Sequence, residues 1–400
     1  VDGCPQGSIC GPYIWNLMMD TLLRQLEQVC KCCAYADDLI IMVEGQSRAE
    51  IEALAGAHLR TVCDWGNSVG VSLAMDKTTT MLLKGRLSAS RHPSIGLNGA
   101  FLRYVTEVKY LGITFGERMC FTPHFTGLKR RLLGVVGQVR RILRNEWGLS
   151  RRAVRTIYNG LFVACATYGS SVWCDAVTTV VGRKKVLACQ RVTMMGCMPV
   201  CRTVSTEAMQ VLLGVPPLDL EVRRRAVLFK VKRRIPLLQG EWLADRNVES
   251  LGLSVCKKLL DECVMSDWQV RWDTCLNGRD TYRYIRDVTF VGSRPDFGFN
   301  LSLGFLLTGH GSLNAFLHQR RLSDTQECHC GLSEETWEHV LCECPSYEDL
   351  RSLSAFGVRQ VRGGFDVSQA LSTSDRVRLL NEFARAAFAR RRVLTHQGIV

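Results

Sequence analysis

The order of hydrophobic and polar residues predicts a loop, a helix and a hairpin at the start of the chain. Glycines and prolines crowd residues 1–12, which is typical of a loop, and Pro12 suits the first turn of a helix with apolar positions from Tyr13 to Val29. Two short apolar runs, 30–35 and 39–43, follow it. Ala36, Asp37 and Asp38 separate these runs, so we expect a hairpin whose tip presents two carboxylates.

A second helix and further strands complete this first region. Ser47 and Glu50 have the spacing of a capping box, and apolar residues from Ile51 to Val62 recur at helical intervals behind them. Strand-like segments are expected at 71–74, 79–83 and 105–115. The first region is therefore predicted to be of the α+β class.

Beyond Phe115 the periodicity becomes helical. One apolar stripe leaves basic side chains on other faces. A further helix is expected after Ser150, with Arg151 and Arg152 in a first turn where the helix dipole favours acids. Residues from about 241 to 324 give no clear pattern. The stripe comprises Leu128, Leu132, Val135, Val136, Val139, Ile142 and Leu143, and the basic residues beside it include Lys129, Arg130, Arg131, Arg140 and Arg141.

The positive charge is concentrated in the middle of the chain. The formal net charge is +13, but residues 1–120 hold 11 basic and 12 acidic side chains, residues 121–240 hold 21 and 5, and residues 241–400 hold 19 and 21. A basic block between two near-neutral ends favours a surface that binds nucleic acid. The alternative is a solvated helical face that serves only solubility.

Composition excludes several other classes. A chain of 400 residues with 46% hydrophobic and 22% charged residues is typical of a globular protein of two or three domains. Its 19 cysteines are odd in number and scattered, which indicates a reducing intracellular setting rather than a disulfide framework. The longest charge-free stretch, 156–174, is interrupted by glycine, serine and asparagine, so no membrane span is expected.

The first group of residues with a chemical meaning is a glycine-containing loop followed by paired carboxylates. Gly3 to Ser8 precede the first helix, and Tyr35 to Asp38 form the expected hairpin tip. Adjacent carboxylates on a tight hairpin can hold Mg²⁺, which activates a primer hydroxyl and neutralises a leaving phosphate. Asp-Asp is also common turn chemistry, which is the alternative for a hairpin taken alone.

In this order the two segments resemble the palm of reverse transcriptases, especially those of retrotransposons without long terminal repeats. The resemblance implies that Gln6, Gly7 and Ser8 position template and nucleotide. It also implies that Asp37 is a Mg²⁺ ligand, that Asp38 is its acidic neighbour, and that Tyr35 lies beside the substrate.

Two later segments match the same family. Asp76-Lys77-Thr78 resembles the next motif, which makes Lys77 a candidate proton donor to pyrophosphate, against the alternative of an exposed lysine after a turn. Residues 108–112, with Tyr110, Leu111 and Gly112, resemble the primer-grip hairpin, although the pattern alone predicts only a strand that ends in glycine.

The family carries its other catalytic aspartate upstream of the loop that contains Gln6. We therefore expect these 400 residues to be a C-terminal fragment that is inactive alone, since a two-metal site needs carboxylates from both segments.

The second group of residues is Cys328, Cys330, His339 and Cys344, a combination of thiols and imidazole that suits tetrahedral Zn²⁺. Cys342 and His329 lie close by, so the choice of ligands is open, and a chance cluster in a cysteine-rich chain is the alternative. Residues 306–347 around them resemble the C-terminal knuckle of the same retrotransposons, most closely the type-1 elements that insert into arthropod ribosomal RNA genes.

The resemblance implies three regions: the C-terminal part of a palm at 1–116, a helical basic thumb and connection at 117–240, and a nucleic-acid-binding region at 241–400 with a zinc knuckle at 328–344. It implies an RNA-directed DNA polymerase that uses deoxynucleotides, the element's RNA as template and nicked target DNA as primer, acts in the nucleus, and has its endonuclease elsewhere in the polyprotein. Its oligomeric state is open. The rivals are a non-catalytic nucleic-acid-binding protein from a decayed element and an intron-encoded maturase, which would not predict the knuckle.

Overall fold

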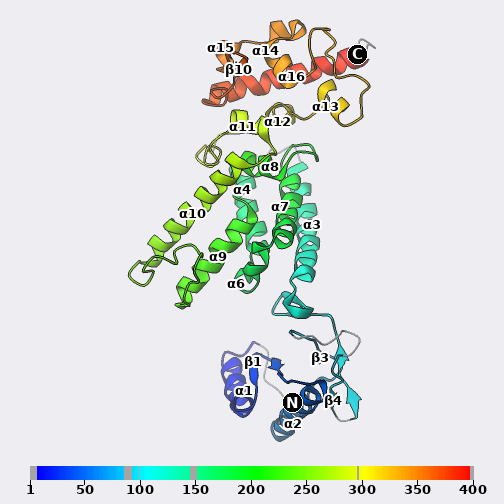
Figure 1. The fold of residues 1–400 in the computed structure, drawn as a ribbon, viewed down its shortest axis with the longest axis vertical. Coiled ribbons are helices and arrows are strands. Elements are labelled where there is room, and N and C mark those ends of the chain that lie inside the picture. Colours follow the sequence, from blue (N-terminus) through cyan, green and yellow to red (C-terminus); the bar gives the residue numbers. More distant parts are fainter. Residues whose placement is uncertain (1–6, 85–91, 98, 145–150, 295–296, 397–400) are drawn as a thin grey trace. The chain divides into compact units, whose positions relative to one another are not determined.

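The computed structural model describes residues 7–84, 92–97, 99–144, 151–294 and 297–396, and the chain divides into two units, 1–124 and 125–400 (Figure 1). The first unit combines helices with short strands, and the second is mainly helical. Within the described ranges, every helix is too short or too polar to span a lipid bilayer.

The first helix and hairpin of unit 1 form where the sequence predicts them. Helix α1 (Gly11–Glu27) has proline near its start, and the Ser8 hydroxyl accepts a hydrogen bond from the Gly11 N–H at 3.1 Å. Strands β1 (Lys31–Tyr35) and β2 (Asp38–Met42) pair antiparallel with Tyr35 opposite Asp38. The connection is therefore only Ala36 and Asp37, whereas the pattern placed Asp38 there as well.

Helix α2 (Arg48–Val69) begins with the predicted cap. The Ser47 hydroxyl accepts from the Glu50 N–H at 3.2 Å, and the Glu50 carboxylate accepts from the Gln46 N–H at 2.7 Å. The helix ends at Gly70, whose φ of 73° lies in the left-handed region that glycine adopts without strain.

Alternate residues of the hairpin pack on the two helices and form the core of unit 1. Cys32 and Ala34 of β1 and Leu39 and Ile41 of β2 lie against apolar residues of α1 and α2. The Trp65 indole also donates a hydrogen bond to the Thr21 hydroxyl at 2.8 Å. The buried members of this core are Met19, Leu22, Leu26, Val62 and Trp65.

The later strands of unit 1 differ from the prediction. The strand expected at 71–74 is wrong, because the Val71 N–H bonds back to the Gly66 carbonyl and the Ala74 carbonyl accepts from Lys77 and Thr78 in a turn, which leaves few groups for a ladder. The strand expected at 79–83 forms over only two residues. The strand expected at 105–115 splits into the two strands of a hairpin. The strands are β3 (Thr79–Thr80), β4 (Gly96–Leu97), β5 (Ala100–Phe101), β6 (Arg103–Tyr104), β7 (Glu107–Tyr110) and β8 (Ile113–Gly116), with pairs β3/β6, β4/β5 and β7/β8.

In its described residues, unit 2 is a succession of helices with one small hairpin, and Figure 1 draws this unit from cyan to red. Short 3-10 segments of this unit occur at Cys174–Thr178 and Pro345–Leu350, and a π-helical turn spans Tyr158–Val163, while the 3-10 segment Glu117–Met119 belongs to unit 1. The α-helices are α3 (Thr122–Arg144), α4 (Arg151–Ile157), α5 (Ala164–Ala166), α6 (Ser170–Trp173), α7 (Val180–Cys197), α8 (Thr206–Leu213), α9 (Leu218–Arg233), α10 (Leu253–Thr274), α11 (Arg279–Tyr284), α12 (Leu301–Thr308), α13 (Asn314–Gln319), α14 (Trp337–Cys342), α15 (Leu353–Phe356) and α16 (Ser374–His396), and the hairpin is β9 (Arg359–Val361) with β10 (Gly364–Asp366).

The long helix α10 lies in the stretch that gave no clear pattern. It packs along α9 and buries every fourth residue, which is the helical signal that the sequence does contain. The polar residues between these positions obscure it. The buried positions are Cys256, Leu260, Val264, Trp268 and Trp272.

A buried glutamine joins the helices at the centre of unit 2. Gln190 of α7 is fully buried, and its amide donates to the Tyr158 hydroxyl at 2.9 Å and to the Pro216 carbonyl at 2.8 Å. Its amide oxygen accepts from the Gln210 amide at 2.7 Å and from the Leu218 N–H at 3.0 Å. All of its hydrogen-bonding capacity is used, so the site fixes α7, α8 and the start of α9 relative to one another.

Candidate functional site

The carboxylate hairpin is fixed at its tip by helix α1. Ala36 has a φ of 52°, a left-handed conformation that a two-residue hairpin connection requires at its first position. The Trp15 indole donates a hydrogen bond to the Ala36 carbonyl at 2.8 Å. Asp37 follows in the connection and Asp38 opens β2, and both are exposed. The two carboxylates therefore stand at a defined position in water, where cations can reach them.

The β7–β8 hairpin brings Tyr110 close to the carboxylate hairpin. Strands β7 and β8 are joined by Leu111 and Gly112, both with positive φ, at 44° and 82°. Burial raises the pKa of Tyr110 above its usual value, and the nearby Cys33 thiol and Asp38 carboxylate raise it further. The pattern alone predicted one strand here, and the structure instead forms a tight turn beside the carboxylate hairpin.

The remaining predicted palm residues lie on loops and turns. Gln6 lies outside the described residues, Gly7 is exposed with a φ of 87°, and Ser8 contacts the start of α1. Tyr35 is 63% exposed at the end of β1. Lys77 is exposed in the turn after Ala74, so both interpretations of this lysine stay open.

The basic face of α3 is exposed as expected. Leu128 and Leu132 are buried while Lys129, Arg130 and Arg131 face solvent. In the described part of the chain, Arg130 and Arg131 form no ion pair with an acidic side chain. Arg140 and Arg141 belong to α3 and Arg151 and Arg152 to α4, but their side chains lie outside the described part.

Other basic residues of the middle region form ion pairs with acidic side chains of unit 2. Arg224 of α9 contacts Glu221 at 2.8 Å and Asp261 at 3.2 Å, and Lys230 contacts Glu241 at 2.7 Å. Burial alone would raise the pKa of Glu221, but Arg224 and Arg225 both contact its carboxylate and hold the pKa below its usual value. The surface available to a polyanion is thus narrower than the summed charge indicates.

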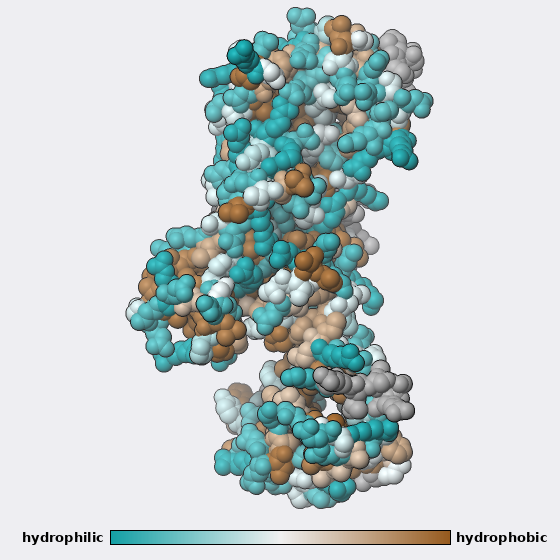
Figure 2. Space-filling model, viewed as in Figure 1, coloured by the Kyte–Doolittle hydropathy of each residue, from teal (hydrophilic) through white to brown (hydrophobic). Residues whose placement is uncertain are grey.

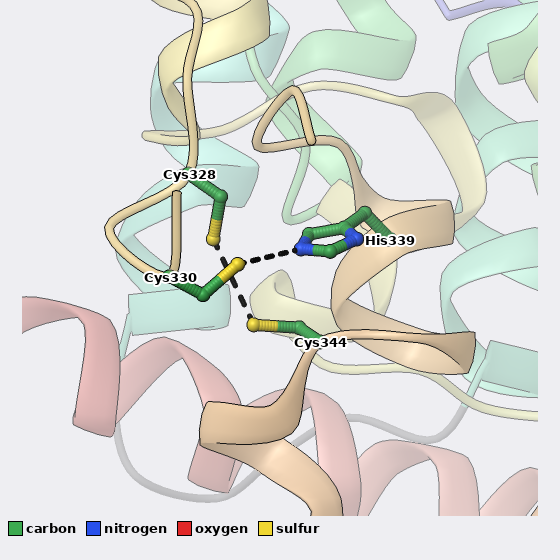
Figure 3. Close-up of side chains that lie close together, drawn as sticks. All are labelled: Cys328, Cys330, His339 and Cys344. Carbon is green, nitrogen blue, oxygen red and sulfur yellow. Dashed lines mark hydrogen bonds between the residues drawn. The ribbon is translucent and has the colours of Figure 1, made fainter. Parts of the chain in front are cut away.

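The four predicted zinc ligands lie together in unit 2. Figure 3 shows the side chains of Cys328, Cys330, His339 and Cys344 pointing toward one another, and their ligand atoms all lie within 4.8 Å of one another. The sulfurs of Cys328 and Cys344 are 3.7 Å apart, and the Cys330 sulfur is 3.2 Å from Nε2 of His339. Zn–S bonds of about 2.3 Å in a tetrahedron separate two sulfurs by about 3.8 Å, so the arrangement fits a zinc ion.

The thiols of this cluster differ in acidity. Burial raises the pKa of Cys328 and of Cys344. Burial alone would raise the pKa of Cys330, but hydrogen bonds with the Leu332 backbone N–H, His339, Cys328 and Cys344 lower it to about 7.

Cys342 and His329, the two alternative ligands, do not join this group. Burial raises the pKa of Cys342 to about 12, with Glu338 and Glu343 adding to the rise. His329 lies with Cys328 and Glu335 in a second cluster. Glu335 is fully buried and already paired there with Arg391 of α16 at 2.6 Å, so a guanidinium supplies the positive charge.

This buried pair ties α16 to the cysteine-rich segment. Arg391 also donates to the Asn314 amide oxygen at 2.8 Å, and the Asn314 N–H donates to Glu335 at 2.7 Å. Its neighbour Arg390 makes a second contact, with Asp349 at 2.7 Å and with the Ser346 carbonyl at 2.7 Å. Nothing in the sequence pattern marked this pair, because its members are far apart in the chain.

Comparison with known families adds the context of these sites. The family model described as reverse transcriptase (RNA-dependent DNA polymerase) matches residues 1–115. The chain is 46% identical, over 98% of its length, to the putative 115 kDa protein in type-1 retrotransposable element R1DM of Drosophila melanogaster, and covers 38% of that protein.

Two further relatives are retrovirus-related Pol polyproteins from type-1 retrotransposable elements. That of R1 from Bradysia coprophila is 45% identical over 97% of this chain, and 39% of its own length is covered. That of R1 2 from Nasonia vitripennis is 38% identical over 97% of this chain and 96% of its own length. The chain thus spans about two fifths of the Drosophila and Bradysia relatives. No solved structure matches it.

The Arg391–Glu335 pair yields a stability prediction. We expect Arg391→Met to lower the free energy of unfolding by about 3–5 kcal/mol, because Glu335 is left buried without a counter-ion. The double variant Arg391→Met/Glu335→Leu should recover much of this loss. The measurement is urea unfolding followed by circular dichroism, with the exposed neighbour Arg392→Met as the matched control. Equal effects at 391 and 392 would contradict the role of the buried pair.

Proposed function

The chain belongs to the Pol polyproteins of type-1 retrotransposable elements, and we propose that it forms part of the RNA-directed DNA polymerase of such an element. In this proposal residues 1–116 are part of the palm, 117–240 are the thumb and connection, and 241–400 are a nucleic-acid-binding region with a zinc knuckle at 328–344. The observation that carries it is the tip of the β1–β2 hairpin, which lies inside the matched reverse transcriptase region.

The hairpin residues fit a divalent cation. Asp37 is an exposed carboxylate on a two-residue connection that Trp15 anchors, and Asp38 is adjacent, so hard oxygen ligands are available at a fixed place. We propose Asp37 as a Mg²⁺ ligand, together with a carboxylate that the family resemblance puts upstream of Gln6. Mg²⁺ bound there would lower the pKa of the primer hydroxyl and neutralise charge on the phosphates.

The other palm residues have positioning roles in this proposal. Gln6, Gly7 and Ser8 would position template and incoming deoxynucleotide beside Tyr35, and Lys77 would give a proton to the departing pyrophosphate. Residues 110–112 would hold the primer end, which the proximity of Tyr110 to Asp38 supports.

The proposed partners follow from family membership. The template is the element's own RNA and the primer is nicked target DNA, so the polymerase would work in the nucleus, with the nicking endonuclease elsewhere in the polyprotein. The exposed Lys129, Arg130 and Arg131 on α3 support a contact with nucleic-acid phosphates. A decayed element that only binds nucleic acid would keep this contact and lose synthesis.

The first prediction from the proposed function concerns Asp37. The test uses a polyprotein that contains this chain and has the full length of the Drosophila relative. In it, Asp37→Ala should reduce DNA synthesis on an RNA template by about two orders of magnitude or more, because loss of the Mg²⁺ ligand misaligns the primer hydroxyl and the phosphate it attacks. Incorporation of labelled deoxynucleotide measures it, and RNA binding should stay near normal. The exposed Asp64→Ala on α2 is the matched control. Near-normal synthesis by Asp37→Ala would refute the assignment.

The second prediction concerns the basic face of α3. Replacing Lys129, Arg130 and Arg131 by Gln should weaken RNA binding and reduce the slope of log affinity against log salt by about three, one for each lost phosphate contact. Lys257, Lys258 and Arg385, also exposed, form the charge-matched control triple and should leave the slope unchanged. An unchanged slope in the α3 variant would return that face to a solvation role.

The third prediction concerns zinc. The 400-residue chain should bind one Zn²⁺ through Cys328, Cys330, His339 and Cys344, which elemental analysis after gel filtration measures. Cys330→Ser and His339→Ala should lose the metal, since three ligands hold it poorly. Cys342→Ser, a buried thiol outside the group, should retain it. Equal loss in Cys342→Ser would mean that the ligand set is a different one.

A further inference from the structure

The imidazole of His339 is held from two directions. The Thr336 hydroxyl caps α14 by accepting from the His339 N–H at 3.1 Å, which fixes the start of the helix that carries the ring. The ring directs Nε2 at the Cys330 sulfur, 3.2 Å away (Figure 3). The other nitrogen, Nδ1, points away from the thiols and lies 3.3 Å from Oε2 of Glu343.

The contact with Glu343 determines which nitrogen carries the hydrogen. A carboxylate only accepts hydrogen bonds, so Nδ1 must be the donor in this contact. The neutral ring then has its lone pair on Nε2, on the side of the three thiols. This is the tautomer that a metal ion among those thiols requires.

We propose that Glu343 is a positioning residue of the metal site, which orients the His339 ring and holds the tautomer whose lone pair lies on Nε2. The proposal rests on the zinc site of the proposed function. Carboxylates that bond to a ligating histidine act in this way and, when removed, weaken metal binding by about 10–100-fold. Glu343 itself touches none of the three thiols through a described contact.

The backbone strengthens this assignment. The His339 carbonyl accepts from the Glu343 N–H at 2.9 Å and from the Cys344 N–H at 2.8 Å. One carbonyl therefore fixes both the residue that orients the histidine and the next thiol ligand. The Glu343 carbonyl in turn accepts from Arg351 at 3.3 Å.

Because Glu343 is exposed, its effect on His339 can be tested separately from any contribution to the stability of the fold. Its side chain is 52% exposed, whereas that of His339 is 3% exposed. Removing an exposed carboxylate leaves no cavity and no buried unpaired charge, so the fold should tolerate the change. The effect of substitution should thus fall on metal affinity.

The experiment measures Zn²⁺ affinity of the 400-residue chain by competition with a chromophoric chelator. Glu343→Ala should bind Zn²⁺ about 10–100-fold more weakly, and Glu343→Gln, whose amide oxygen still accepts from Nδ1, should lie closer to the unsubstituted chain. Glu348→Ala, another exposed glutamate a few residues on, is the matched control and should bind normally. With Co²⁺ in place of Zn²⁺, the visible absorption bands of Glu343→Ala should change while one ion per chain still binds at saturation.

The outcomes separate this inference from the zinc site itself. If the unsubstituted chain binds no Zn²⁺, the zinc site of the proposed function fails. If that chain binds Zn²⁺ and Glu343→Ala binds it equally well, or if Glu348→Ala weakens it as much, the positioning role is refuted. A Glu343→Ala chain that stays unfolded in saturating Zn²⁺ would also overturn it, by assigning Glu343 to the fold.

Discussion

The two-residue connection between β1 and β2 is the constraint on which the proposed polymerase site depends. With only Ala36 and Asp37 between the strands, Tyr35 must lie opposite Asp38, and a shift of one residue would turn the core side chains of the hairpin toward solvent. The left-handed conformation of Ala36 and the hydrogen bond from Trp15 fix the tip further. The position of Asp37 is thus set by the burial of residues that have no chemical role.

The arginines of unit 2 fall into two kinds, those that form ion pairs with nearby acidic side chains and those that are exposed to solvent. Arg391 is buried against Glu335, and Arg224 lies between Glu221 and Asp261, so both hold elements together. Arg130 and Arg131 are exposed on α3 with a buried apolar stripe behind them. Figure 2 shows hydrophilic residues over most of the visible face of the C-terminal helices, so the polarity of a surface residue does not by itself distinguish an arginine held in an ion pair from one that is left exposed. The net charge of the middle region includes both kinds of arginine and therefore does not indicate how many of them are exposed.

The parts of the structure that the sequence predicts are those governed by local rules. The α1 start, the Ser47 cap and the first hairpin depend on residues within four or five positions of one another. The split of 105–115 into two strands was missed because Leu111, which is not a turn residue, takes a positive φ. Helix α10 was missed because polar residues separate its buried positions, and Arg391 because its partner is distant in sequence. In the metal cluster the spacing predicted the four residues that lie together, while Glu343 carries only a weak signal, its place four residues after His339.

The proposed zinc site and the Arg391 contact lie on the same short segment and depend on different interactions. Cys328 lies both in the group with Cys330, His339 and Cys344 and in the group around Glu335, to which the next residue, His329, also belongs. Three thiolates this close together would repel one another, and in the proposed zinc site the charge of the cation would offset that repulsion. The neighbouring carboxylate receives its cation from the chain itself, through Arg391. A guanidinium donates hydrogen bonds but offers no lone pair, so it matches the single buried carboxylate of Glu335 without coordinating anything. In the proposed zinc site, four ligand atoms that converge on one point would instead be held by a metal ion.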